Sequence, residues 1–322
     1  MSAIPTQLPF GTLNAGDFCG EVLRGLRRTP KRLSPKFFYD AVGSSLFERI
    51  CEQPEYYLTR TEIGILDRHA DDMAAALGPE ALLIEYGSGS ARKTAQLLGA
   101  LPDCAGYVPV EISASALDGC AVALAARFPA LTIAPVCGDF TNLVLDADEL
   151  PAHRQRVIYF PGSTLGNFET ADALALLRQM RRQMGADGAA LIGIDLRKNA
   201  ADIEAAYNDA AGVTADFTLN MLARFNRELR ADFELRHFRH RARYNAEAGR
   251  IETHIVSLAD QDVRVAGWRI RFDAGEAMHV EYSYKYSVPQ FAALAARAGL
   301  SVQRLWTDPA QRFSVQLLVP SR

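Results

Sequence analysis

Between about residue 61 and residue 195, short apolar segments alternate with amphipathic segments, and this pattern constrains the fold more than any other feature of the sequence. The apolar segments are ALLIEYG, AGYVPVEIS, LTIAPVCGDF, RVIYFPGS and AALIGIDL. Strands that are apolar throughout are buried on both faces, and amphipathic helices between them are typical of a parallel sheet covered on both sides. The sequence therefore predicts a doubly wound α/β domain.

The segments on either side follow other patterns. Residues 15–60 and 196–225 predict helices, whereas FRHRARYNAEAGRIETHIVSL and VRVAGWRIRF alternate with period two and predict an antiparallel β-meander. A helix in SVPQFAALAARAGL and a strand in FSVQLLVP are then expected to return to the parallel sheet. We predict two domains, one formed by 61–195 plus 287–322 and a smaller α+β domain formed by 1–60 plus 196–286.

Composition excludes several classes of function. A net charge of −3 provides no basic field for a nucleic acid, and no segment reaches the roughly 20 apolar residues of a membrane span. The five cysteines are scattered, as in proteins of a reducing compartment, and the first residues lack the pattern of a secretory signal. We expect a cytoplasmic protein that binds neither membranes nor nucleic acid. Because His237, His240 and His254 have no carboxylate or cysteine at ligand spacing, we expect no metal.

The first apolar segment runs directly into Gly87-Ser-Gly89-Ser and then into a predicted helix, a context in which backbone approaches a nucleotide closely. A dinucleotide fingerprint needs a third glycine where this chain has Arg92, which disfavours a dehydrogenase. Glu85 before the first glycine instead resembles the first motif of class I methyltransferases. Their cofactor, S-adenosylmethionine, has no pyrophosphate and needs backbone near its methionine end.

Acidic residues also follow the next two strands. Glu111 ends the second strand, where a carboxylate can accept hydrogen bonds from ribose hydroxyls, and Asp139 with Phe140 ends the third, where they can hold adenine. Ordinary explanations remain open: the glycines as turn residues, Glu111 as a solvated strand end and Asp139 as a helix cap. Three such positions at successive carboxyl ends of one sheet favour a ligand crevice there.

Five further stretches closely resemble the L-histidine Nα-methyltransferases of ergothioneine biosynthesis. They are FFYDAVGSSLFERICEQPEYYLTRTE, VIYFPGSTLGNFE, AAYNDAAGVTADFTLN, EYSYKYS and LWTDPAQRFSVQL. The resemblance implies a Rossmann-like class I methyltransferase domain and a second domain that closes over an amino acid. It also implies a monomer that converts histidine to trimethylhistidine (hercynine) and S-adenosylmethionine to S-adenosylhomocysteine.

The same resemblance implies particular site residues. For the cofactor these are Tyr39, Gly87, Lys93, Glu111, Asp139, Phe140 and Ser163, and for the substrate Tyr56, Asn167, Tyr207, Glu281 and Ser283. Tyr39 and Asn167 are expected nearest the reacting groups, as catalytic residues. The chain departs from the family at Glu111, where an aspartate is common, and at Thr253, where we expect an apolar methionine that lines the pocket.

Methyl transfer from a sulfonium needs a correctly placed neutral amine and the exclusion of water, without a metal or covalent nucleophile. Neutral side chains such as Tyr56, Asn167 and Tyr207 can hold a carboxylate and orient the amine. Glu281 and Ser283 are two apart on a predicted strand, so they share a face and can together hold both nitrogens of an imidazole. Packed core tyrosines, a turn asparagine and a solvated glutamate are the alternatives. A different amino-acid substrate and a non-catalytic nucleotide-binding scaffold also remain open.

Overall fold

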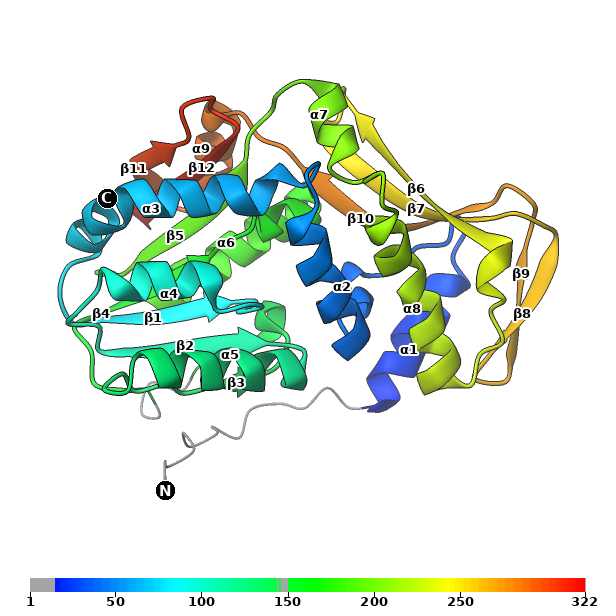
Figure 1. The fold of residues 1–322 in the computed structure, drawn as a ribbon, viewed down its shortest axis with the longest axis horizontal. Coiled ribbons are helices and arrows are strands. Elements are labelled where there is room, and N and C mark those ends of the chain that lie inside the picture. The colour runs from blue at the N-terminus through cyan, green and yellow to red at the C-terminus, as the bar shows by residue number, and fades with distance from the viewer. Residues whose placement is uncertain (1–14, 144, 146–149, 322) are drawn as a thin grey trace. The chain divides into compact units, whose positions relative to one another are not determined.

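The computed structural model describes residues 15–143, 145 and 150–321, and the chain divides into two compact units (Figure 1). Unit 1 contains the described residues of Leu58–Arg197 and Tyr284–Arg322, and unit 2 contains those of Leu13–Tyr57 and Lys198–Ser283. Residues 1–14, which the sequence assigns to the predicted second domain, lie outside the described residues. No helix within the described ranges is long and apolar enough to cross a membrane.

Unit 1 is built on a seven-stranded sheet with the strand order β11-β12-β5-β4-β1-β2-β3. The strands are β1 (Ala81–Tyr86), β2 (Gly106–Glu111), β3 (Val136–Cys137), β4 (Gln155–Phe160), β5 (Ala189–Asp195), β11 (Leu300–Thr307) and β12 (Phe313–Pro320). The first five are parallel, with β1 between β2 and β4, and β1, β2 and β5 are buried along their whole length. The predicted doubly wound α/β fold is confirmed.

Three details of the sheet differ from the prediction. The segment FSVQLLVP does return to this sheet as β12, but it pairs antiparallel with β5. The segment that follows the last helix, which was not predicted as a strand, forms β11 and pairs antiparallel with β12. The predicted strand in LTIAPVCGDF is shortened to β3 at Val136–Cys137, and the residues before it contribute an isolated bridge at Ile133. Exposed residues at Ser301 and at 303–305 of β11 interrupt the apolar pattern that marks the other strands.

Helices cover both faces of the sheet. They are α3 (Tyr57–Leu77), α4 (Arg92–Gly99), α5 (Ala114–Arg127), α6 (Thr170–Met184) and α9 (Val288–Arg297). Leu82, Ile84 and Tyr86 point to one face, where they share an apolar core with α6 and α9. On the other face Glu85 bonds to Thr94 of α4. The alternation along β1 therefore places α3, α4 and α5 opposite α6 and α9 (Figure 1).

Unit 2 combines helices with two small sheets. Its helices are α1 (Ala15–Leu26), η1 (Pro35–Phe38), α2 (Ala41–Glu52), α7 (Ala200–Ala205), α8 (Val213–Leu229) and η5 (Leu235–His237), and its strands are β6 (Phe238–Asn245), β7 (Arg250–Ser257), β8 (Gln261–Val265), β9 (Trp268–Phe272) and β10 (Ala277–Tyr284). The predicted meander is interrupted: β7 lies between β6 and β10, while β8 and β9 form a separate hairpin.

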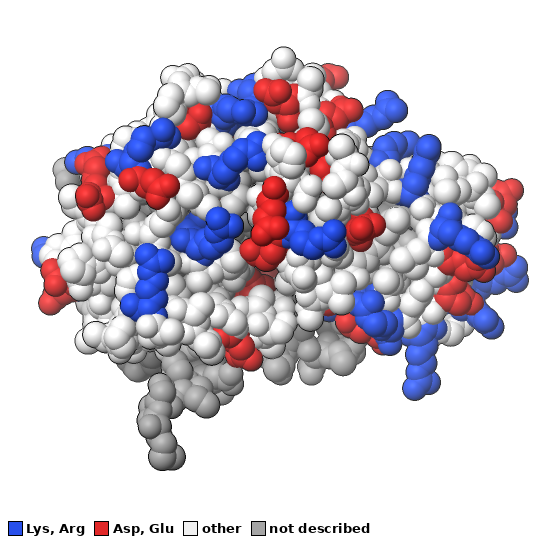
Figure 2. Space-filling view, in the orientation of Figure 1, with Lys and Arg blue, Asp and Glu red and all other residues white. Residues whose placement is uncertain are grey.

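Charged side chains of both signs are interspersed over the face shown in Figure 2. This distribution agrees with the nearly balanced composition of 35 Lys and Arg against 38 Asp and Glu. Several of these charges form short pairs, such as Arg264 with Asp232 at 2.8 Å and Arg304 with Asp72 at 2.7 Å. Exposed pairs of this kind contribute little to stability, because solvent screens the two charges.

Candidate functional site

The glycine loop after β1 is tied to the neighbouring strand by its own backbone. Gly87 has a φ of +74°, which side-chain-bearing residues rarely adopt, and its N–H donates to the Val110 carbonyl at 2.8 Å. The carboxylate of Glu111 accepts hydrogen bonds from the N–H groups of Gly89 at 3.2 Å, Ile112 at 2.9 Å and Ser113 at 3.1 Å. Burial raises the pKa of Glu111, and these three bonds oppose that effect. Glu111 is thus fixed beside the loop.

Asp139 and Phe140 lie at the same edge of the sheet. The Phe140 ring stacks on Tyr86 with a centroid distance of 5.3 Å and an interplanar angle of 15°, and a Cβ placed on Gly87 would come within 3.8 Å of that ring. Asp139 accepts from the backbone N–H and hydroxyl of Thr141 at 2.9 and 2.6 Å, so it does cap a short helix. Asp139 still lies at the edge of the sheet beside Glu111, because the N–H of the preceding residue, Gly138, donates to the Glu111 carbonyl at 3.0 Å.

Lys93 and Ser163 flank the opposite side of the loop. The Lys93 ammonium lies 2.8 Å from the carboxylate of Glu62, which also accepts the N–H of Gly162. Ser163 adopts a left-handed φ of +60°, and its hydroxyl accepts the N–H of Asp195 at 2.9 Å. Its side chain is therefore turned toward β5 and holds the segment after β4 on the sheet. Asn167 ends the short helix Thr164–Asn167 in that segment.

Glu85, the acidic residue that suggested a methyltransferase motif, is buried beneath the loop. Its carboxyl group accepts hydrogen bonds from the hydroxyls of Thr94, at 2.7 Å, and Tyr107. Burial raises the pKa of Glu85 to about 8, although both bonds and Lys93 act in the opposite direction. The contacts give Glu85 a role in joining β1, β2 and α4.

In unit 2, the predicted substrate residues come together from three distant segments. The hydroxyls of Tyr207 and Ser283 are 2.7 Å apart, and the rings of Tyr56 and Tyr207 meet edge to face at 6.4 Å. Burial raises the pKa of Tyr56 well above its usual range, and the neighbouring Tyr207, Cys51, Tyr39 and Glu281 raise it further. A phenol in these surroundings stays protonated at neutral pH and keeps its hydrogen-bond donor.

The predicted catalytic residues belong to different units. Tyr39 lies in unit 2, where its ring packs against Phe47 and Phe217 at centroid distances of 6.0 and 5.7 Å. Asn167 lies in unit 1, with Gly87, Lys93, Glu111, Asp139, Phe140 and Ser163. All the predicted cofactor residues except Tyr39 therefore lie in unit 1. All the predicted substrate residues except Asn167 lie in unit 2.

Two further residues of unit 2 stand out: His240, which contacts the substrate group, and Thr253, where the chain departs from the family. The ring Nε2 of His240 donates to the Tyr207 carbonyl at 2.9 Å, a contact that the alternating pattern of β6 did not indicate. Thr253 is buried on β7 in line with Ile251 and Ile255, and its hydroxyl has no hydrogen-bond partner in the described part of the chain. A buried hydroxyl without a partner is unfavourable unless a ligand satisfies it.

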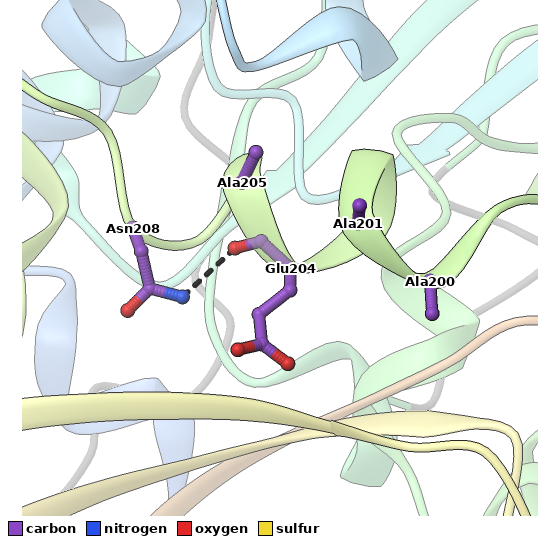
Figure 3. Close-up of a pocket in the computed structure, with 5 residues that line it drawn as sticks. All are labelled: Ala200, Ala201, Glu204, Ala205 and Asn208. Atoms are coloured by element: carbon purple, nitrogen blue, oxygen red, sulfur yellow. Dashed lines mark hydrogen bonds between the residues drawn. The ribbon is translucent and has the colours of Figure 1, made fainter.

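A pocket elsewhere in unit 2 holds none of the predicted residues. It is lined by Ala200, Ala201, Glu204, Ala205 and Asn208, and its polar groups are engaged (Figure 3). The Asn208 amide donates to the carbonyls of Glu204 at 2.8 Å and Ala242 at 3.1 Å, and the Glu204 carboxylate accepts the N–H of Tyr244. Among the described residues, no three His, Cys, Asp or Glu side chains are grouped to hold a metal ion.

Comparison with known proteins identifies the family. The family model described as histidine-specific, S-adenosylmethionine-dependent methyltransferase matches residues 18–320. The chain is 40% identical to the histidine N-alpha-methyltransferase of Mycolicibacterium smegmatis over 95% of this chain and 97% of that protein, and 40% identical to that of Mycobacterium tuberculosis over 92% and 93%. It is 33% identical to ergothioneine biosynthesis protein 1 of Neurospora crassa over 91% of this chain and 34% of that protein.

These matches extend over nearly the whole chain and confirm the resemblance that its separated motifs indicated. The glycine loop and the convergent tyrosines both fall inside the matched residues. The chain therefore belongs to the family of S-adenosylmethionine-dependent, histidine-specific methyltransferases.

Proposed function

We propose that the chain transfers methyl groups from S-adenosylmethionine to the α-amino nitrogen of L-histidine, up to trimethylhistidine, in ergothioneine biosynthesis. The observation that carries the proposal is the convergence of Tyr56, Tyr207 and Ser283 in unit 2, with Glu281 close enough to act on the pKa of Tyr56. The names of the mycobacterial and Neurospora relatives support the substrate and the pathway.

The residues of unit 1 fit S-adenosylmethionine. Glu111 presents a carboxylate beside the loop for ribose hydroxyls, Phe140 presents an aromatic ring for adenine, and Gly87 leaves the loop backbone uncovered by a side chain. Lys93 supplies a cation for the carboxylate of the methionine end. When bound, the cofactor supplies a methyl group on a sulfonium, which an amine lone pair can attack directly.

The proposed substrate residues divide into two groups by chemistry. Tyr56, Tyr207 and Asn167 are neutral hydrogen-bonding groups that can hold the α-carboxylate and orient the amine. The amine must lose its proton before attack, and neutral side chains allow this because they do not stabilise the ammonium as a carboxylate would. Glu281 accepts an imidazole N–H, and the hydroxyl of Ser283 bonds the other ring nitrogen. Leaving these groups unpaired beneath a bound ligand would penalise other amino acids by about 1–3 kcal/mol each.

The remaining parts of the proposal concern the protein as a whole. We propose that it acts as a monomer in the cytoplasm, on a free amino acid and not on a nucleic acid. The scattered cysteines support a reducing compartment and the balanced charge supports the exclusion of nucleic acid, whereas the monomer is what the family resemblance implies. A second candidate substrate, a different amino acid, is favoured by one observation, the buried unpartnered hydroxyl of Thr253.

The test is a competition among substrates. Purified protein is incubated with S-adenosylmethionine and an equimolar mixture of the twenty amino acids, and mass gains are read by mass spectrometry. We expect one to three methyl groups on histidine alone. Methylation of another amino acid would show that the second candidate, and not histidine, is the substrate. No methylation at all would favour a non-catalytic, cofactor-binding scaffold.

A further inference from the structure

Glu62 is a buried carboxylate at the edge of the parallel sheet that carries the proposed cofactor residues. It lies on α3, its side chain is 1% exposed, and its carboxylate accepts both the Lys93 ammonium at 2.8 Å and the Gly162 N–H at 2.9 Å. These partners belong to α4 and to the segment after β4. One side chain thus joins three elements at the place where the methionine end of the cofactor is expected.

The space for this carboxylate comes from a glycine of β5. A Cβ at Gly193 would lie 2.2 Å from the Glu62 Oε1 and 3.1 Å from the Gly162 nitrogen, so no side chain can stand at this position while Glu62 occupies it. Strand β5, which contains Gly193, is buried along its whole length. Glu62 therefore rests directly on the backbone of the sheet, and its carboxylate has little freedom to move.

We propose that Glu62 is a positioning residue that fixes the Lys93 ammonium and balances its charge, so that Lys93 binds the carboxylate of S-adenosylmethionine. The inference rests on the proposed function, which assigns Lys93 to the cofactor. Lysine has a long flexible side chain, and ordering it costs rotamer entropy unless a partner holds it beforehand. Glu62 is such a partner.

Charge balance acts in the same direction. S-adenosylmethionine carries two cationic groups, the ammonium and the sulfonium, and one carboxylate. A site with the Lys93 cation alone would attract the carboxylate but repel the two cations, whereas the Glu62–Lys93 pair presents both signs. Removing the Glu62 charge should therefore weaken binding of the whole cofactor, and it should not affect a ligand that lacks the amino-acid part.

The experiment measures cofactor affinity in the full-length protein by calorimetry. Glu62→Gln keeps an oxygen that can accept the Gly162 N–H but removes the charge opposite Lys93. We expect the Kd for S-adenosylmethionine to rise roughly tenfold, and the Kd for 5′-methylthioadenosine, which has no amino-acid part, to stay unchanged. Asp71→Asn, an exposed substitution on the same helix, is the matched control and should change neither Kd.

A double-mutant cycle separates this inference from the proposed function. Lys93→Met should weaken S-adenosylmethionine binding, and Glu62→Gln should weaken it much less in the Lys93→Met background than in the wild type, because Glu62 acts mainly through Lys93. If Lys93→Met leaves the affinity unchanged, the cofactor role of Lys93 is wrong and the inference falls with it. If Lys93→Met weakens binding but Glu62→Gln leaves it unchanged or tightens it, the role of Glu62 alone is overturned.

A merely structural role of Glu62 gives a different result. It would weaken 5′-methylthioadenosine and S-adenosylmethionine equally, and that outcome also overturns the inference. If Glu62→Gln does not fold, Glu62→Asp takes its place, because it retains the charge but withdraws it from Lys93 by one methylene. The expected result is then weaker binding of S-adenosylmethionine alone, and equal binding of both ligands to this variant and the wild type would contradict the inference.

Discussion

Glu85 should make the stability of unit 1 fall as the pH rises. In the native state burial raises its pKa to about 8, whereas the ordinary value is 4.5, so between these two pH values the unfolded chain loses a proton that the folded chain retains. Each pH unit in this window lowers the free energy of unfolding by about 1.4 kcal/mol. The total loss in the free energy of unfolding approaches roughly 5 kcal/mol, and most of it has occurred by pH 8.

The substitution Glu85→Gln isolates this contribution. A glutamine oxygen can still accept hydrogen bonds from Thr94 and Tyr107, but it does not ionise. Urea unfolding of both proteins from pH 5 to pH 9 should show the wild type losing about 2 kcal/mol more than Glu85→Gln between pH 6 and pH 8. Asp71→Asn, exposed in the same unit, should follow the wild type. Parallel pH profiles for wild type and Glu85→Gln would refute a buried, neutral Glu85.

Two other substitutions test the substrate group and the core. Glu281→Ala should weaken histidine binding roughly tenfold to a hundredfold, because a hydrogen bond to a charged group is lost. Calorimetry should show the affinity for S-adenosylmethionine nearly intact, and the exposed control Glu247→Ala should change neither affinity. Equal loss of both affinities in Glu281→Ala would count against the assignment. Lys285→Met should lower the free energy of unfolding by about 3–5 kcal/mol, because Lys285 and Asp195 form a fully buried pair at 2.9 Å. Adding Asp195→Asn should recover part of this loss in urea unfolding, and a cost of Lys285→Met below about 1 kcal/mol would contradict a tightly paired buried charge.

The sequence predicts the centre of the fold well because its strands are buried on both faces. ALLIEYG and AALIGIDL are apolar throughout, and they form β1 and β5. At the sheet edge the pattern weakens: β11 has exposed residues and was missed, and β3 is much shorter than its apolar segment. The direction of β12 could not be read either, because an apolar run does not distinguish parallel from antiparallel pairing.

The candidate site shows a similar limit. The glycine loop, Glu111 and Asp139 have local signals, since each follows a strand directly. Tyr56, Tyr207, Glu281 and Ser283 could be named through the family resemblance alone, because their meeting in unit 2 depends on segments far apart in the chain. Glu62 has no local signal at all: it is an ordinary glutamate in a helix, and its pairing with Lys93 and its place over Gly193 depend on tertiary packing.

We propose that the methyl group goes to the α-amino nitrogen of histidine and not to its ring. The most direct test of this proposal is NMR spectroscopy of the product formed from histidine and S-adenosylmethionine labelled with ¹³C in the transferred methyl. We expect long-range couplings from the labelled methyl groups to the α-carbon hydrogen and a final product with three equivalent methyls. Couplings to imidazole ring hydrogens instead would contradict it, because Glu281 and Ser283 would then not be the groups that hold the ring.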